Sequence, residues 1–254
     1  MKNTKIIRAI GGIDDELIER AGKKKANKRK IFAPWLKWAA PAAVCLLLAI
    51  IAIPFLGSDG NFELPLSSGV KVSHIKKPPN IHVSHSLVYL TEEELFAESY
   101  HGYEIVIFEG KVKDVSNIEM NFNGHKTYQA IAEIEVTETI RGNIFAGEVI
   151  TILLPAPVNM NVWVSDTEVS SQITQGTTGI FMPIRYDETS IISMNDATLF
   201  LSEIAGFGML DGERWAFLET ANSLTFARWA YESIAAAKTM DEVRQYIITM
   251  TNNN

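Results

Sequence analysis

The stretch Tyr128–Ile140, YQAIAEIEVTETI, decides the fold that the sequence predicts. Over its thirteen positions one set of residues alternates with mostly polar neighbours: Tyr128, Ala130, Ala132, Ile134, Val136, Glu138 and Ile140. A hydrophobic period of two residues is typical of a β-strand with one buried face. The stretch therefore predicts a long antiparallel strand.

A partner strand precedes it, and a buried strand follows it. Four apolar residues flank Gly110 in the preceding segment: Ile105, Ile107, Val112 and Val115. The link between the two strands, NFNGHK at 121–126, contains Asn123-Gly124, the strongest short turn signal for a hairpin. Residues 148–154 are almost continuously apolar, which predicts a third strand that is buried on both faces.

The carboxyl-terminal half adds further strands and two helix signals. Residues 179–186 predict a strand that Pro183 places at an edge or a bulge, and 213–220 with 224–229 predict a hairpin. Capping boxes predict helices after Thr91, with Glu94, and after Thr239, with Glu242. The second helix has an apolar face made of Val243, Tyr246, Ile247 and Met250.

These elements predict a mainly β domain, a small closed or partly closed antiparallel barrel with short flanking helices. FEGKVKDV, YQAIAEIEVTETIRG and GEVITILLP, about fifty residues in all, resemble the first strands of OB-like domains of the netrin and metalloprotease-inhibitor type. That inhibitor family reaches a metal through amino-terminal cysteines. The only cysteine here is Cys45, so the resemblance implies the fold and not inhibition, and no intrachain disulfide can form.

Charge divides the chain into two parts. Residues 1–37 hold eleven Lys or Arg and four Asp or Glu, whereas the remaining 217 residues hold 12 and 26. An acidic body repels phosphate backbones, so we expect no nucleic-acid binding there.

The nineteen residues Trp38–Leu56 contain no charged side chain. At about 1.5 Å per residue a helix of this length spans roughly 28 Å, close to a bilayer core of about 30 Å. A cleaved signal peptide is the alternative, but 37 residues precede the run and no cleavage site is evident before Gly57. We expect one uncleaved transmembrane helix.

The cations on its two sides predict the orientation. Seven precede or adjoin the run, and the fifteen residues after it hold only Lys71; the seven are Lys23, Lys24, Lys25, Lys28, Arg29, Lys30 and Lys37. The positive-inside rule places the amino terminus in the cytoplasm and the body outside. The predicted order is a cytosolic basic segment (1–37), a transmembrane helix (38–56), an extracytoplasmic linker (57–88) and an extracytoplasmic β-rich domain (89–254).

The cytosolic segment contains a short amphipathic helix signal, IDDELIERAG. The candidate residues for binding a cytosolic partner are Ile13, Asp14, Asp15, Leu17 and Ile18. So short a helix is unstable alone in water, so it is expected to order on a protein or on the membrane surface. With the basic block, the WLKW aromatics and the span, it resembles uncharacterised single-pass membrane proteins of Gram-positive bacteria, some of which are described as anti-sigma-factor-like. The resemblance implies a sigma factor as a possible partner, although the zinc-binding His and Cys set of the better-known anti-sigma domain is missing.

Motifs for catalysis or metal binding are weak. GxSxG and phosphate-binding glycine patterns do not occur. Three sets of residues leave alternatives open. The HxxH motif of His82 and His85, near His74 and His101, provides either metal ligands or linker histidines. The acidic residues Asp166 and Glu168, Asp187 and Glu188, and Asp211 and Glu213 are either catalytic pairs or solvated turn residues, and Trp163, Trp215 and Trp229 form either a sugar-stacking platform or part of the core.

The sequence therefore favours a protein that is not an enzyme and holds no cofactor or metal. The first hypothesis is a bitopic membrane protein whose outer domain binds or senses an envelope or external ligand while the cytosolic helix engages a partner. The rival is an anchored envelope structural or carbohydrate-binding module with no signalling role.

Overall fold

The computed structural model describes residues 60–76, 82–83, 87–158, 163–220 and 223–253. The predicted cytosolic segment and the predicted transmembrane helix lie outside these residues, so both stay predictions. Within the described residues no helix combines the length and the hydropathy that crossing a bilayer requires.

The described chain is mainly β, as the sequence predicts. The strands are β1 (Val70–His74), β2 (His82–Val83), β3 (Ser99–Tyr100), β4 (Tyr103–Glu104), β5 (Ile107–Phe122), β6 (His125–Arg141), β7 (Val149–Leu154), β8 (Trp163–Val164), β9 (Thr178–Phe181), β10 (Ile184–Arg185), β11 (Ile191–Met194), β12 (Ala197–Phe200), β13 (Phe207–Gly208), β14 (Ala216–Thr220) and β15 (Ser223–Thr225). The helices are α3 (Glu92–Leu95) and α4 (Met240–Asn253), with 3₁₀ turns η2 (Ser170–Gln172), η3 (Leu201–Glu203) and η4 (Glu232–Ile234).

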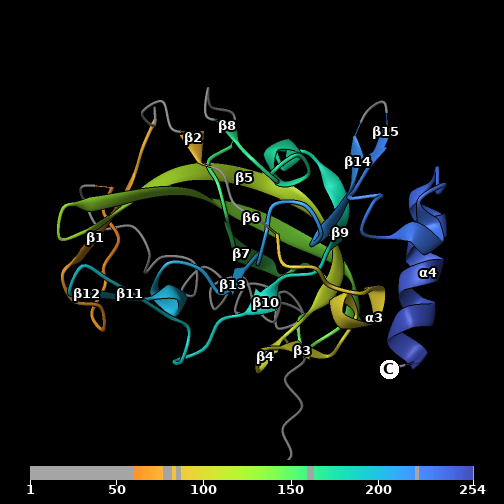
Figure 1. Ribbon diagram of the computed structural model, residues 1–254, viewed down its shortest axis with the longest axis horizontal. Coiled ribbons are helices and arrows are strands. Elements are labelled where there is room, and N and C mark those ends of the chain that lie inside the picture. The colour runs from red at the N-terminus through yellow and green to blue at the C-terminus, as the bar shows by residue number, and fades with distance from the viewer. Residues whose placement is uncertain (1–59, 77–81, 84–86, 159–162, 221–222, 254) are drawn as a thin grey trace, which may run out of the picture. The chain divides into compact units, whose positions relative to one another are not determined.

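Nine strands form one sheet, in the order β10-β13-β7-β6-β5-β9-β14-β15, with β1 also paired to β5. The pairs are antiparallel except for β7 and β13, which are parallel. The sheet curls into a half-barrel around the long β5–β6 hairpin (Figure 1). The partly closed form of the predicted barrel is therefore the one observed.

The β5–β6 hairpin turns where the sequence predicts. Phe122 pairs with His125, and the two residues between them have positive φ angles, 48° at Asn123 and 97° at Gly124. Both central residues of a tight type I′ hairpin turn need this conformation, which Asn and Gly adopt at low cost. The Asn121 carboxamide oxygen accepts a hydrogen bond from the Gly124 backbone N–H at 2.7 Å.

Bulges and two facing glycines allow the sheet to curl. The β5–β6 register shifts at three places along β5, between Ile107 and Phe108, Glu109 and Gly110, and Val112 and Asp114. Gly110 pairs with Gly179 of β9. A Cβ atom on Gly110 would lie 2.6 Å from the Ile134 side chain, so only glycine lets the strands approach this closely.

Two hydrophobic cores pack on opposite faces of β6. Ala130, Ala132 and Ile134 belong to the larger core, and Ile131 belongs to the smaller one with residues of β5 and β12. Neighbouring strand residues point to opposite faces, so β6 is buried on both sides here, beyond the single buried face that its alternation predicts. β7 is also buried on both faces, as predicted, because Ile152 and Leu154 enter the larger core and Leu153 the smaller.

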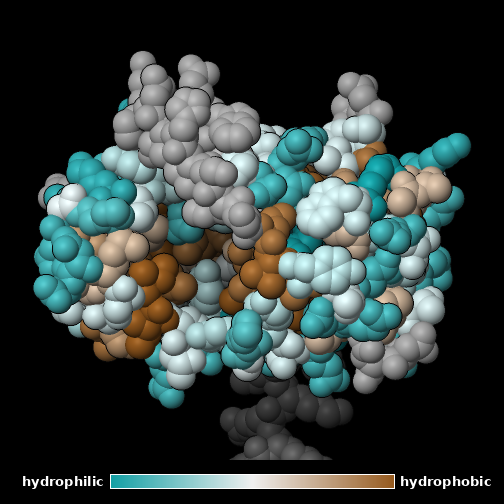
Figure 2. Space-filling model, in the orientation of Figure 1, coloured by the Kyte–Doolittle hydropathy of each residue, from teal (hydrophilic) through white to brown (hydrophobic). Residues whose placement is uncertain are grey.

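Some hydrophobic side chains also reach the surface. On the face seen in Figure 2 they gather around a hollow between the part of the chain that carries β11 and β12 and the part that carries β13, whereas the rest of this face is largely hydrophilic.

Both predicted capping boxes are present. The Thr91 side chain accepts from the Glu94 backbone N–H, and the Glu94 carboxylate accepts from the Thr91 N–H at 2.8 Å. Thr239 and Glu242 make the same pair of bonds, at 3.3 and 3.1 Å, before α4. The predicted apolar face of α4 packs on the larger core through Val243, Tyr246, Ile247 and Met250.

The predicted linker, residues 57–88, needs a correction. Its described portion 60–76 is part of the fold, because β1 pairs with the end of β5 and Val72 is buried in the smaller core. Phe62 and Leu64 pack against the same core. Alternating apolar residues are sparse in this stretch, so its strand forms only because the edge of β5 is there to pair with.

The predicted strand 179–186 is two strands, separated at Pro183. β9 pairs on both sides, with β5 and β14, and is not an edge; β10 pairs with β13 and lies at the end of the sheet order. The predicted hairpin 213–229 is confirmed by the antiparallel pairing of β14 with β15.

Candidate functional site

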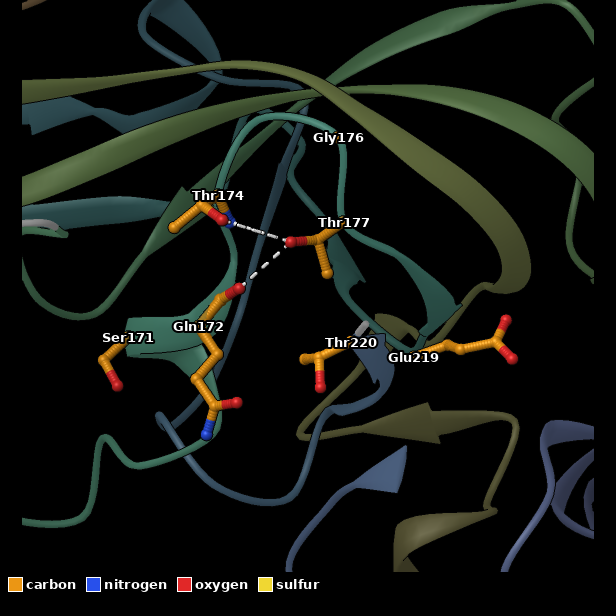
Figure 3. Close-up of a pocket in the computed structure, with 7 residues that line it drawn as sticks. All are labelled: Ser171, Gln172, Thr174, Gly176, Thr177, Glu219 and Thr220. Carbon is orange, nitrogen blue, oxygen red and sulfur yellow. Dashed lines mark hydrogen bonds between the residues drawn. The ribbon is translucent and has the colours of Figure 1, made fainter. Parts of the chain in front are cut away.

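A polar pocket of about 470 Å³ lies where η2 and the following loop meet the end of β14 (Figure 3). Its volume is within the range of about 300 to 1,000 Å³ that small-molecule sites occupy. It is lined by Ser171, Gln172, Thr174, Gly176, Thr177, Glu219 and Thr220.

The loop that forms one wall is fixed to the sheet by its backbone. The Gly176 N–H donates to the Val112 carbonyl, and the Val112 N–H donates to the Thr177 carbonyl, both at 2.9 Å. Gly176 has a φ of 91°, a conformation that favours glycine, and a side chain there would meet open space. Ile173 is fully buried and anchors the loop from beneath. The wall is therefore held in one position before any ligand arrives.

Hydroxyl and amide groups in this wall bind one another. The Thr177 hydroxyl lies 3.2 Å from the Thr174 hydroxyl and 3.2 Å from the Gln172 carbonyl, to which it donates (Figure 3). The Gln172 side-chain amide donates to the Glu168 carbonyl at 3.1 Å, and its oxygen accepts from the Thr225 hydroxyl at 3.3 Å. Gln172 thus connects η2 with β15.

Glu219 supplies the charge of the pocket. It is the one ionisable residue among the residues that line the pocket, and its side chain is exposed. In Figure 3 its carboxylate extends away from the Gln172, Thr174 and Thr177 group. The groups that face one another across the pocket are therefore neutral hydrogen-bonding groups, and the one carboxylate lies exposed at its rim. This arrangement favours a neutral or cationic polar ligand and disfavours an anion.

The three tryptophans considered as a sugar platform do not act together. Trp215 is 1% exposed in the core, and its indole N–H donates to Asp211 at 2.7 Å. Trp229 is 58% exposed. The side chain of Trp163 lies outside the described part of the structure. Core packing, the alternative reading, is confirmed for Trp215.

The loop carboxylates have structural contacts. Asp187 binds the Thr189 backbone N–H at 2.8 Å and the Thr189 hydroxyl at 2.7 Å within its own turn, and these bonds lower its pKa. Asp211 is 8% exposed and forms an ion pair with Arg214 at 2.8 Å, which corrects its interpretation as a solvated turn residue.

Glu213 accepts from the Glu168 backbone N–H. Burial raises the pKa of Glu213, and the nearby carboxylates of Glu168, Asp166 and Asp211 raise it further. Two of the predicted acidic pairs therefore meet in space, but Asp211 is already used by Arg214 and Trp215.

The histidines offer no metal centre in the described residues, where no group of three His, Cys, Asp or Glu side chains could hold an ion. His82 lies in β2, and His85 is outside the described residues. The His74 ring packs against the Phe62 ring, with centroids 4.9 Å apart.

The candidate cytosolic residues Ile13, Asp14, Asp15, Leu17 and Ile18 lie outside the described residues and stay a prediction. The pocket was missed from the sequence. Its one local signal is the hydroxyl- and amide-rich run SSQITQGTT at 170–178.

No family model, no curated protein and no solved structure matches the chain. The OB-like and anti-sigma-like resemblances accordingly stay predictions.

Proposed function

We propose that the protein is a single-pass membrane protein whose extracytoplasmic β-domain binds a polar, neutral or amine-bearing ligand such as a saccharide or amino sugar. The preformed pocket between η2 and β14 carries this proposal. Its rigid loop, its hydroxyl and amide groups and its single lining carboxylate suit a hydroxyl-rich ligand.

The sequence supports the anchoring part of the proposal. The uncharged run 38–56 and the cations that precede it favour one span with the body outside. The acidic body and the basic amino-terminal segment would then face different compartments.

On the cytosolic side, the amphipathic segment engages a protein, with Ile13, Leu17 and Ile18 as its apolar contacts and a sigma factor as the partner that the resemblance implies. The rival function is an anchored envelope module that binds the same ligand class but transmits no signal.

Ligand binding is tested with residues 57–254 and a panel of soluble saccharides, including glucose, glucosamine, N-acetylglucosamine and chitooligosaccharides, by NMR chemical-shift perturbation. For an amine-bearing ligand such as glucosamine, we expect chemical-shift changes only at residues 171–177 and 219–220. These changes should be lost in the Glu219→Gln variant. Glu188→Gln, which changes an exposed acid outside the pocket, is the matched control. Shifts elsewhere, or none with any sugar, would refute saccharide binding.

The signalling part is tested separately. Leu17→Ala with Ile18→Ala should abolish co-purification of a cytosolic partner with the full chain while membrane insertion is retained. Unchanged partner recovery would refute Leu17 and Ile18 as the contact residues, and no partner at all would favour the rival function.

A further inference from the structure

The folded domain starts very close to the predicted membrane span. The span ends at Leu56, and the chain is already bonded to the domain at Gly60, whose carbonyl accepts from the His74 backbone N–H at 3.3 Å. Next, Asn61 bridges to Ser73, and the Phe62 N–H donates to the Val72 carbonyl at 3.1 Å.

This short connection limits the height of the domain above the bilayer. Four Cα-to-Cα steps separate Leu56 from Gly60, and even a fully extended chain covers at most about 14 Å in four steps. The headgroup region of one leaflet is itself about 5 to 8 Å thick, because the bilayer measures about 40 to 45 Å against a core of about 30 Å. Gly60 must then lie within or just above the headgroups.

We propose that the surface formed by residues 60–62 and 74–76 rests on the headgroups of the outer leaflet. The proposal depends on the anchored topology of the proposed function, but not on its ligand. The surface carries the Phe62–His74 ring pair, the half-buried Ile75 and the exposed Lys76. Aromatic rings and lysines with apolar stems are the side chains that suit a membrane interface.

Charge does not hold this surface on the membrane. Asp114 and Glu133 lie close enough to His74 to act on its pKa, so the surface carries both signs. The attachment comes from the short connection, which keeps the local concentration of lipid at this surface high.

The proposed lipid contact and the pocket lie at different points along β5. His74 pairs with Ile118 of β5, whereas Thr178, beside the pocket, pairs with Lys111 of β5. Seven residues of strand correspond to about 23 Å. The proposed lipid contact and the polar pocket are therefore about this far apart along β5.

The test uses the full chain in phosphatidylcholine vesicles that contain a nitroxide-headgroup lipid. In a Cys45→Ala background, a fluorophore is attached to Lys76→Cys and, as the matched control, to Gln245→Cys, an exposed position on α4. Figure 1 shows α4 at the opposite end of the domain from β1. The lipid nitroxide should quench the label at 76 several times more strongly than the label at 245.

Equal quenching at the two positions, or none at 76, would overturn the proposal. A flexible Gly/Ser insertion after Gly57 should abolish the quenching at 76, and unchanged quenching would overturn the short connection as its cause. Flotation of each variant with the vesicles reports insertion independently. A chain that does not float overturns the anchored topology itself and so identifies a failure of the proposed function.

Discussion

Replacing Asp211 with alanine is expected to destabilise the domain more than any loss of a surface acid. The carboxylate is buried and accepts from the backbone N–H groups of Glu213 and Arg214, both at 2.9 Å. It also binds the Arg214 Nε at 2.9 Å and the Trp215 indole N–H at 2.7 Å. The substitution leaves a guanidinium that is 4% exposed without its counter-charge.

Breaking a buried ion pair from one side costs about 3 to 5 kcal/mol, and losing the indole hydrogen bond adds about 1 kcal/mol. We therefore expect the free energy of unfolding to fall by about 4 to 6 kcal/mol. For a domain of roughly 200 residues this corresponds to a Tm lower by about 8 to 24 °C, at about 2 to 4 °C per kcal/mol.

Urea unfolding of residues 57–254, followed by tryptophan fluorescence, measures the change. Asp187→Ala is the matched control, because its carboxylate is exposed and bonds only within its own turn. Combining Asp211→Ala with Arg214→Met removes the unpaired charge and should recover part of the lost stability. If Asp211→Ala and Asp187→Ala unfold at the same urea concentration, the buried pair is not the stabilising element inferred from the structure.

Three further changes test the fold. Gly110→Ala should lower the free energy of unfolding, measured by thermal unfolding, by about 1 to 3 kcal/mol, because the new Cβ would lie 2.6 Å from the Ile134 side chain. The control Gly206→Ala should leave the stability nearly unchanged, because its Cβ would have no neighbour nearer than 3.9 Å. Burial raises the pKa of Glu109 above its ordinary value of 4.5 although Arg244 lowers it, so the folded state holds that proton more tightly than the unfolded state. In the wild type, relative to Glu109→Gln, the stability measured by urea unfolding should therefore fall as the pH rises from 4.5 through the raised pKa of the folded state. Parallel pH profiles of the two proteins would refute this. Residues 87–254 should unfold at lower urea than 57–254, since losing the buried Val72 alone removes about 1.5 to 3 kcal/mol; identical midpoints would show that 60–76 is a linker after all.

The features that the sequence determined are local. The Asn123-Gly124 turn, both capping boxes and the apolar face of α4 each depend on residues within a few positions of one another. Backbone preference and short-range hydrogen bonds act at that distance, so the pattern of residues was enough to predict these elements. The same holds for the β14–β15 hairpin.

Only the tertiary structure decided the rest. Residues 60–76 join the sheet through pairing with β5, and Arg141 donates to the Phe96, Ala97 and Ile105 carbonyls at 2.6, 2.6 and 3.2 Å. The pocket unites 171–177 with 219–220. Such contacts join segments that are far apart in the chain, and their energy comes from burial and from pairing polar groups that water no longer reaches. No local sequence pattern specifies which distant group will be the partner. These contacts could therefore be identified only from the folded structure, in which the curled sheet brings the segments together.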